Sequence, residues 1–376
     1  MELQPLLDLL VERDGSDLFI AVGRPPSVKL QGQVRSVGQT ALDEATAREM
    51  VLATMEAPQR EKFMQEKELN YALVCQREER FRVNAFFQMG CIGMVVRRIK
   101  TIIPTHADLF LPPVLLDLCM EKRGIVILVG GTGTGKSTSL AALISHRNQH
   151  SSGHIVTVED PIEYIHRHDR CIVTQREIGV DTLSWENALE NALRQAPDVI
   201  LIGEIRDQQS MRQAIGMSNT GHLVLASLHA NNANQAMNRV INFFPPHQRN
   251  YLLHELSLNL RGFVAQQLVP TVNGDHRAAV EVMINTPRVA DLIRQGEVDE
   301  IKEIMGKSRK EGMQTFDQAL HDLYREGVIS YDSAIAFAES KNDLRLLIKL
   351  GKGAADSAAA GLELQPAKPP STGWQA

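Results

Sequence analysis

The spacing of hydrophobic and polar positions predicts a small α+β domain over residues 1–101. Helical periodicity is expected over Leu3–Val11 and in the segment between Leu42 and Gln65. Short runs rich in Val, Ile and Phe have the spacing of antiparallel strands, and they lie at Ser16–Val22, Val28–Leu30, Asn70–Cys75, Arg80–Phe87 and Gly93–Ile99. We therefore expect an α+β sheet domain at the N-terminus.

A different pattern follows residues 102–108, which carry a proline and little periodicity and which we interpret as a linker. Helical segments now alternate with continuous apolar runs, at Ile125–Val129, His154–Val158, Val199–Ile202, Leu223–Ala226 and Ala279–Ile284. Strands that are apolar on both faces predict a mostly parallel sheet covered by helices. Ser184 and Asp207 are expected to cap two of these helices. We assign residues 109–287 to this α/β core.

The C-terminal region has few strand signals. Residues 288–352 are helical in pattern and are expected to form a helical subdomain. Within it, Leu344–Leu350 is amphipathic, so it either packs inside the subdomain or docks a partner. Residues 353–376 are dominated by Ala, Gly, Pro and Ser, a composition that predicts a disordered tail.

Composition and charge exclude several classes of protein. The apolar share of 43% is ordinary for a folded domain, and a net charge of -5 provides no basic field to attract nucleic acid. The longest apolar run, at 124–131, is far shorter than the ~20 residues of a membrane helix. The N-terminus lacks the positive charge of a signal peptide, and the cysteines form no C-x-x-C pair. We therefore expect a cytosolic protein without a zinc module or disulfide scaffold.

The strongest motif is a phosphate-binding loop. Residues 130–138 read G-G-T-G-T-G-K-S-T and fit G-x-x-x-x-G-K-[ST], directly after an expected strand and before an expected helix. Inward-turned backbone N–H groups and the helix N-terminus bind phosphate, the lysine adds a charge, and the serine hydroxyl is a Mg²⁺ ligand. The expected ATP-binding residues are Gly131, Thr132, Gly133, Thr134, Gly135, Lys136, Ser137 and Thr138.

A second motif resembles a Walker B strand. The apolar run at 198–202 ends in Gly203 and Glu204, which places Glu204 at the sheet edge where it can orient a water. Gly203 stands where a generic P-loop NTPase has a metal-binding Asp. Mg²⁺ would therefore need other ligands, among waters, Ser137 or another acid.

An acidic cluster at Glu159–Glu163 follows another expected strand, so its carboxylates should reach the same edge of the sheet. Glu163 is the expected second catalytic carboxylate and, with Ser137 and Glu204, a candidate metal ligand. A solvated turn with Pro161 at its corner is the alternative.

Two histidines, His222 and His229, flank one short strand. Six intervening residues point them apart rather than at a single metal ion. Both are candidates for contact with the nucleotide, where a histidine could sense the γ-phosphate. A structural hydrogen-bonding role is the alternative.

In this order the motifs resemble those of the secretion-ATPase superfamily that powers type IV pili and type II secretion. Glu159–Glu163 looks like its Asp box, Gly203-Glu204 its atypical Walker B, and Thr220–His229 its His box. The resemblance covers roughly residues 1–350 and implies a PAS-like N-terminal domain before a RecA-like ATPase domain. The short N-terminal domain and the lack of a tetracysteine insert match the PilT/PilU retraction branch. Pro287–Gly296 matches the A-I-R-N-L-I-R-E-like element of PilT only in part, which is more similar to PilU-type members.

The resemblance also implies an assembly and a role. Members form homohexameric rings with nucleotide between the two domains, and Arg82 and Arg97 lie at the positions of the arginines that reach the phosphates. Solvated strand positions are the alternative for both. The implied role is pilus retraction in twitching motility, peripheral to the cytoplasmic side of the inner membrane, with a PilT paralogue and a PilC-like platform protein as partners.

Two other functions stay open at this point. One is a hexameric nucleic-acid translocase, which the acidic charge balance disfavours. The other is a nucleotide-binding adaptor ring with little turnover, which the presence of both Lys136 and Glu204 disfavours.

Overall fold

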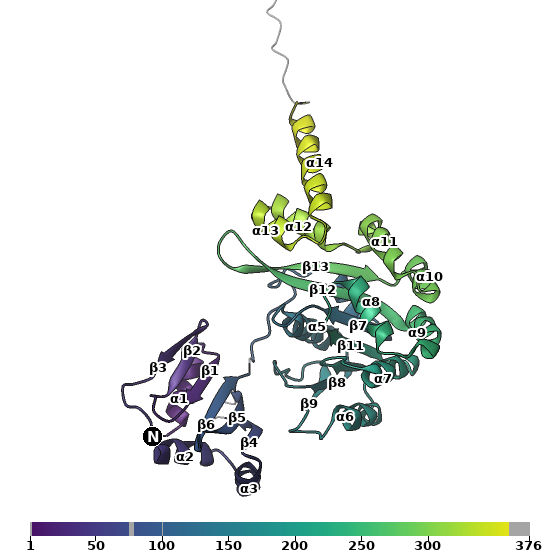
Figure 1. Cartoon of the computed structure of the whole chain (residues 1–376). Helices are drawn as coiled ribbons and strands as arrows, with labels where there is room; N and C mark the ends of the chain where they lie inside the picture. Colours follow the sequence, from purple (N-terminus) through teal and green to yellow (C-terminus); the bar gives the residue numbers. More distant parts are fainter. Residues whose placement is uncertain (1, 75–78, 100, 361–376) are drawn as a thin grey trace, which may run out of the picture.

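The computed structural model describes residues 2–74, 79–99 and 101–360, with residues 351–360 described by their backbone alone. Two sheet domains follow one another along the chain. The C-terminal helices lie beside the last two strands of the second sheet (Figure 1). Among the described residues no helix is both long and apolar enough to cross a membrane.

The N-terminal domain is a six-stranded antiparallel sheet with the order β3-β2-β1-β6-β5-β4. Its strands are β1 (Asp17–Ile20), β2 (Ser27–Leu30), β3 (Gln33–Ser36), β4 (Glu68–Val74), β5 (Arg80–Gln88) and β6 (Cys91–Arg98). Helices α1 (Gln4–Glu12), α2 (Glu44–Leu52) and α3 (Ala57–Glu66) contribute to its apolar core. Alternate residues of β5, namely Phe81, Val83 and Ala85, are buried in that core. The residues between them, which include Arg82, therefore lie on the other face of the sheet.

The second sheet is parallel except at one edge, as expected, and has the order β13-β12-β7-β11-β10-β8-β9. Its strands are β7 (Gly124–Val129), β8 (Gly153–Glu159), β9 (Cys171–Glu177), β10 (Val199–Ile202), β11 (Leu223–Leu228), β12 (Leu260–Pro270) and β13 (His276–Ile284). One face packs against α4 (Val114–Met120) and α5 (Lys136–His150). The other packs against α6 (Trp185–Ala192), α7 (Gln208–Asn219), α8 (Ala233–Asn242) and α9 (Pro246–Asn259). The expected α/β fold class is confirmed.

Helix starts follow the predicted caps. The Ser184 side chain accepts a hydrogen bond from the N–H of Asn187 at the start of α6, and Asp207 accepts one from Ser210 at the start of α7. Between β6 and α4, the described residues 101–113 contain no helix or strand.

Three strands were not expected from the sequence. All four residues of β3 are exposed, so they carry no apolar signal. In β9 exposed and half-buried positions follow Cys171 and Val173, because this strand is the border of the sheet. In β12 the polar pair Gln266 and Gln267 interrupts the apolar run. Tertiary packing, rather than local pattern, determines these elements.

The C-terminal helices are α10 (Pro287–Gln295), α11 (Ile301–Lys307), α12 (Phe316–Arg325), α13 (Tyr331–Phe337) and α14 (Lys341–Ala360). Leu344 and Ile348 of α14 are buried in the core of this domain while Leu346 is exposed, which favours packing over partner docking. The helix continues to Ala360, into the segment expected to be disordered. Alanine has the highest helix propensity, and the residues before 361 are rich in it. The remainder of the expected tail, 361–376, lies outside the described residues.

Candidate nucleotide site

The phosphate loop connects β7 to α5, as the motif predicts. Gly133 and Gly135 have φ angles of 78° and 89°, in the region that favours glycine, and Gly135 is the N-cap of α5. A Cβ atom on Gly130 would lie 2.7 Å from the carbonyl oxygen of Gln266. The glycines are thus required by backbone conformation and by close packing, which leaves the N–H groups of the loop available at the start of the helix.

Lys136 is the first residue of α5, and its side chain reaches back to the loop. Its Nζ donates hydrogen bonds to the carbonyl oxygens of Gly130 at 2.9 Å and Gly131 at 2.8 Å. Burial lowers the pKa of Lys136, and the charges of Glu204 and Glu163 oppose that shift. A cation and two carboxylates from distant parts of the sequence therefore share one electrostatic environment.

Gln266 of β12 supports the loop from the adjacent strand, a role that the sequence analysis missed. Its Nε2 donates to the carbonyl of Thr134 at 2.8 Å, and its Oε1 accepts from the Ser139 hydroxyl at 2.8 Å. The side chain is buried. No local signal could have identified this residue, because β12 lies beside β7 only through long-range sheet pairing, which places Ala265 opposite Val129.

Glu204 lies between a histidine and an arginine. Its carboxylate is 3.4 Å from Nε2 of His229 and accepts a hydrogen bond from Nε of Arg206 at 2.7 Å. That hydrogen bond raises the pKa of Arg206. Because β10 and β11 are parallel neighbours, the residues that follow them meet at one edge. The proximity of Glu204 and His229 thus follows from the sheet order.

The acidic cluster at 159–163 reaches the same edge. Burial raises the pKa of Glu159 to about 7, although hydrogen bonds donated by Thr157 and Gln175 oppose the shift. A pocket lies beside the phosphate loop at this edge of the sheet. Glu163 lines this pocket together with the loop, and Glu204 and His229 line it from the ends of the neighbouring strands. The side chains brought together include Lys136, Ser137, Glu159, Asp160, Glu163, Glu204, Arg206 and His229.

Arg82 and Arg97 lie in a neighbouring cleft between the two domains. They are cross-strand partners on β5 and β6, and both line a cleft that also includes Thr138, Glu163 and Tyr164 of the ATPase domain. Nε of Arg97 donates to the buried carboxylate of Asp17 at 2.7 Å. The charge of Arg82 reaches Glu177, where it opposes the rise in pKa that burial causes. Glu163 lines both the cleft and the phosphate-loop pocket.

His222 lies at the opposite end of β11, which makes its assignment to the nucleotide wrong. Its backbone carbonyl accepts from Gly124 at the first residue of β7, and its Nδ1 is 3.0 Å from the Met217 carbonyl and 3.0 Å from the Thr220 hydroxyl. The phosphate loop follows the last residue of β7. The six-residue strand β11 therefore holds the two histidines at its opposite ends. His222 has the structural hydrogen-bonding role that was the alternative.

Comparison with known proteins fits this geometry. A family model described as "Type II/IV secretion system protein" matches residues 8–326. The chain belongs to the type II/IV secretion ATPase family. The PilU ATPase of Pseudomonas aeruginosa is 56% identical over 352 residues, which are 93% of this chain and 92% of that protein. The PilT retraction ATPase of the same organism is 36% identical over 334 residues, 89% of this chain and 97% of PilT.

A solved structure of another secretion ATPase of this family has the same fold. The crystal structure of the pilus retraction motor PilT with bound ADP superposes with a TM-score of 0.86 at 33% identity, covering 92% of this chain and 99% of PilT. The predicted membership of the PilT/PilU branch is thereby confirmed. The higher identity to PilU agrees with the partial match of Pro287–Gly296 to the PilT element.

The atypical Walker B of this secretion ATPase has a steric cause. A Cβ atom on Gly203 would lie 3.2 Å from the Cα atom of Glu159 and 3.2 Å from the carbonyl oxygen of Val158. Both atoms belong to the backbone of the neighbouring strand β8, so neither can move aside cheaply. A side chain at this position, including the metal-binding Asp of other P-loop NTPases, would have to displace the backbone of β8 by a few tenths of an ångström.

We expect Gly203→Ala to destabilise the protein by about 1–3 kcal/mol, because overpacking a closely packed site displaces backbone. Chemical denaturation measures this change. The matched control is Gly216→Ala on α7, where a Cβ atom would meet nothing within 4 Å. It should leave stability unchanged or raise it slightly. Equal effects of the two substitutions would contradict the steric explanation.

Proposed function

We propose that the protein is an ATP-hydrolysing motor for type IV pilus retraction, of the PilU type. The observation that carries the proposal is the convergence of Lys136, Ser137, Glu163 and Glu204 on one pocket beside the phosphate loop. The PilU and PilT relatives, which cover most of the chain, supply the biological process.

In the proposed mechanism the loop amides and Lys136 bind the phosphates of ATP, with Gln266 holding the loop in shape. Glu204 orients the attacking water for in-line displacement. His229, 3.4 Å from Glu204, lines the pocket and would detect the γ-phosphate. Arg206 donates a hydrogen bond to Glu204 and thereby orients its carboxylate.

The site fits Mg²⁺, which prefers oxygen ligands and keeps several waters. The Ser137 hydroxyl and the carboxylates of Glu163 and Glu204 line the same pocket, and Gly203 provides no ligand of its own. A bound Mg²⁺ would neutralise charge on the β- and γ-phosphate oxygens. Glu159 and Asp160 are the neighbouring acids that line the same pocket.

Arg82 and Arg97 would act from the N-terminal domain. A guanidinium can bind phosphate oxygens in a bidentate manner, and the cleft that holds both arginines adjoins the phosphate-loop pocket at Glu163. We propose that nucleotide in this cleft draws the two domains together and that its hydrolysis releases them. The connection at 102–108 would then act as the hinge between domains 1–101 and 109–287.

The proposed assembly is a homohexameric ring that works with a PilT paralogue and a PilC-like platform protein, at the cytoplasmic side of the inner membrane. The charge balance and the relatives offer no support for a nucleic-acid substrate.

The purified full-length chain tests this function. We expect phosphate release from ATP that requires Mg²⁺, is lost on chelation, and is not stimulated by single-stranded DNA or RNA, together with a ring mass by light scattering. Strong stimulation by nucleic acid with salt-sensitive binding would favour a translocase. ATP binding without phosphate release would favour an adaptor ring.

A further inference from the structure

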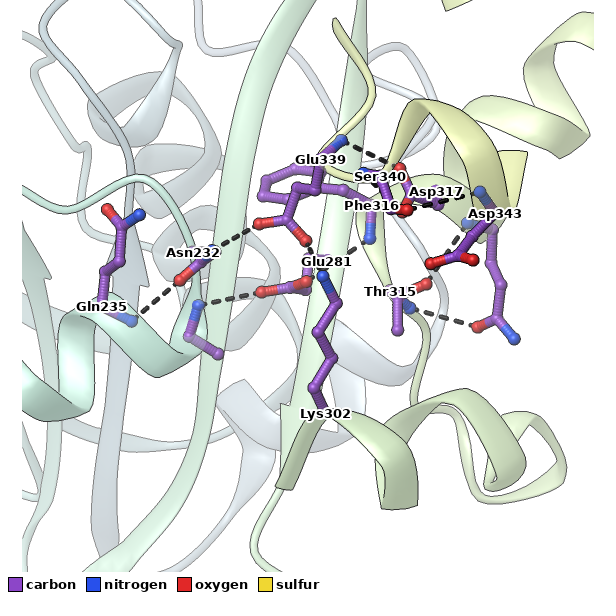
Figure 2. A network of polar contacts seen from close by, with 12 residues as sticks. Asn232, Gln235, Glu281, Lys302, Thr315, Phe316, Asp317, Glu339, Ser340 and Asp343 are labelled. Carbon is purple, nitrogen blue, oxygen red and sulfur yellow. Dashed lines mark hydrogen bonds and ion pairs between the residues drawn. The ribbon is translucent and has the colours of Figure 1, made fainter. Parts of the chain in front are cut away.

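A buried carboxylate outside the nucleotide pocket joins the ATPase core to the C-terminal helices (Figure 2). Glu281 of β13 pairs with Ala265 of β12, which pairs with Val129 at the end of the strand before the phosphate loop. The residue is 2% exposed. Because a buried charge without partners is very costly, the partners of this carboxylate indicate what it does.

Glu281 accepts hydrogen bonds from the first amide of two helices. One carboxylate oxygen accepts from the N–H of Ala233 at 2.8 Å, and the other accepts from the N–H of Phe316 at 3.4 Å. Ala233 is the first residue of α8 and Phe316 the first of α12. Helix N-terminal N–H groups lack partners within the helix and carry partial positive charge. One carboxylate therefore clamps two helix starts together.

The start of α8 lies close in the chain to the nucleotide pocket. His229 follows β11, and only three residues separate it from Ala233. The last of these, Asn232, caps α8 by accepting from the N–H of Gln235 at 2.8 Å, and its amide donates to Glu339. The segment from His229 to Ala233 is thus held by β11 at one end and by Glu281 and Glu339 at the other.

We propose that Glu281 is a positioning residue of the ATPase site, which fixes His229 beside Glu204 by clamping the start of α8 to α12. The inference rests on the proposed function, since the placement of His229 affects turnover only if Glu204 acts in hydrolysis. The same clamp gives the C-terminal helices a route to the site, because a shift of α12 moves the carboxylate that holds α8.

The other charged groups at this junction complete the clamp. Lys302 of α11 forms an ion pair with Glu339 at 2.6 Å. Burial raises the pKa of Glu281 to about 7; the hydrogen bonds from Ala233 and Phe316 and the charge of Lys302 oppose the rise, while Glu339 adds to it. The ionised form is therefore held by two helix starts and one cation.

Asp317 provides a matched control in the same cluster. It is buried, and burial raises its pKa as it does that of Glu281. Its carboxylate accepts from the N–H of Glu339 at 3.0 Å and of Ser340 at 3.1 Å. These bonds hold the α13–α14 connection to α12 and reach α8 only indirectly, through the Glu339 side chain that accepts from Asn232.

The first test compares Glu281→Gln with Asp317→Asn in steady-state ATP hydrolysis by the full chain. The glutamine amide turns a donor toward one of the two N–H groups, so one half of the clamp is lost. We expect kcat to fall roughly 10- to 100-fold, as small misplacements near a catalytic centre do, with the Kd of a fluorescent ATP analogue nearly unchanged. Asp317→Asn should lower kcat less than Glu281→Gln does, because Asp317 reaches the start of α8 only indirectly, through Glu339 and its contact with Asn232.

The second test is hydrogen exchange of the nucleotide-free protein, which does not depend on ATPase activity. Glu281→Gln should speed exchange in 229–235 and 313–318, whereas Asp317→Asn should speed it mainly in 315–318 and 338–341 and less in 229–235. Asn232→Ala reaches the same helix start from a partly exposed position and keeps the test open if Glu281→Gln folds poorly; it too should speed exchange in 229–235 and lower kcat.

A fall in kcat for Glu281→Gln no larger than for Asp317→Asn, or unchanged exchange in 229–235, would overturn the positioning role, as would full activity of Asn232→Ala. Failure of the proposed function would look different: the wild-type chain itself would release no phosphate, while the exchange patterns could still follow the clamp.

Discussion

Replacing Glu204 by Gln should reduce kcat for ATP hydrolysis by about 10²- to 10⁴-fold, the contribution of a positioned general base or water-orienting group. The amide is nearly the same size as the carboxylate, so the pocket keeps its shape while the negative charge beside His229 and Arg206 is lost. ATP binding should be retained, because the phosphate-loop amides and Lys136 are untouched. Phosphate release and equilibrium nucleotide binding, measured on the same preparation, separate the two effects.

The control for this substitution is Glu190→Gln, the same chemical change at an exposed position of α6. It should leave both quantities at the wild-type level. If Glu204→Gln retained steady-state hydrolysis, the water-orienting role would have to pass to another group, with Glu163 as the next candidate.

Removal of the Lys136 side chain should weaken nucleotide binding, whereas Glu204→Gln should lower kcat. A hydrogen bond to a charged group contributes about 1.5–3 kcal/mol, so Lys136→Ala should weaken ATP and ADP binding roughly 10- to 100-fold. The loop also loses the bonds from Nζ to the carbonyls of Gly130 and Gly131. Titration with a fluorescent nucleotide analogue, with Mg²⁺ present, measures the change in Kd.

Lys122→Ala is the matched control, since Lys122 is exposed just before the first residue of β7, at the far end of the strand from the loop. Its Kd should equal that of the wild type. An unchanged Kd in Lys136→Ala would show that the nucleotide does not sit at the phosphate loop.

The sequence was most informative where function depends on local chain order. A phosphate loop needs a strand, glycines and a helix in immediate succession, and all of these lie between Gly124 and His150. Glu204 and Glu163 could be placed at the same edge because residues after parallel strands meet there. His222 was misassigned because its family motif was carried over whole, although a strand of six residues separates the two histidines.

The sequence was least informative where one strand depends on another far away. Gln266 reads as a polar interruption of an apolar run, and only the pairing of β12 with β7 makes it a support of the loop. The same holds for Glu281, which an isolated strand would present as an unfavourable buried charge. The sequence shows that Gly203 stands in place of the usual Asp, but the reason, close packing against the backbone of β8, is visible only in the structure.

The position of β12 has a consequence for how the protein is made. All the recognisable nucleotide motifs emerge from the ribosome by residue 229, yet the strand that borders β7 on one side is synthesised only at 260–270. Until then β7 is an edge strand of the sheet. The Thr134 carbonyl and the Ser139 hydroxyl cannot yet form their hydrogen bonds with Gln266. A nascent chain should therefore acquire the capacity to hold nucleotide late in translation, and a fragment cut after α9 would carry every signature sequence and still lack the shape that they require.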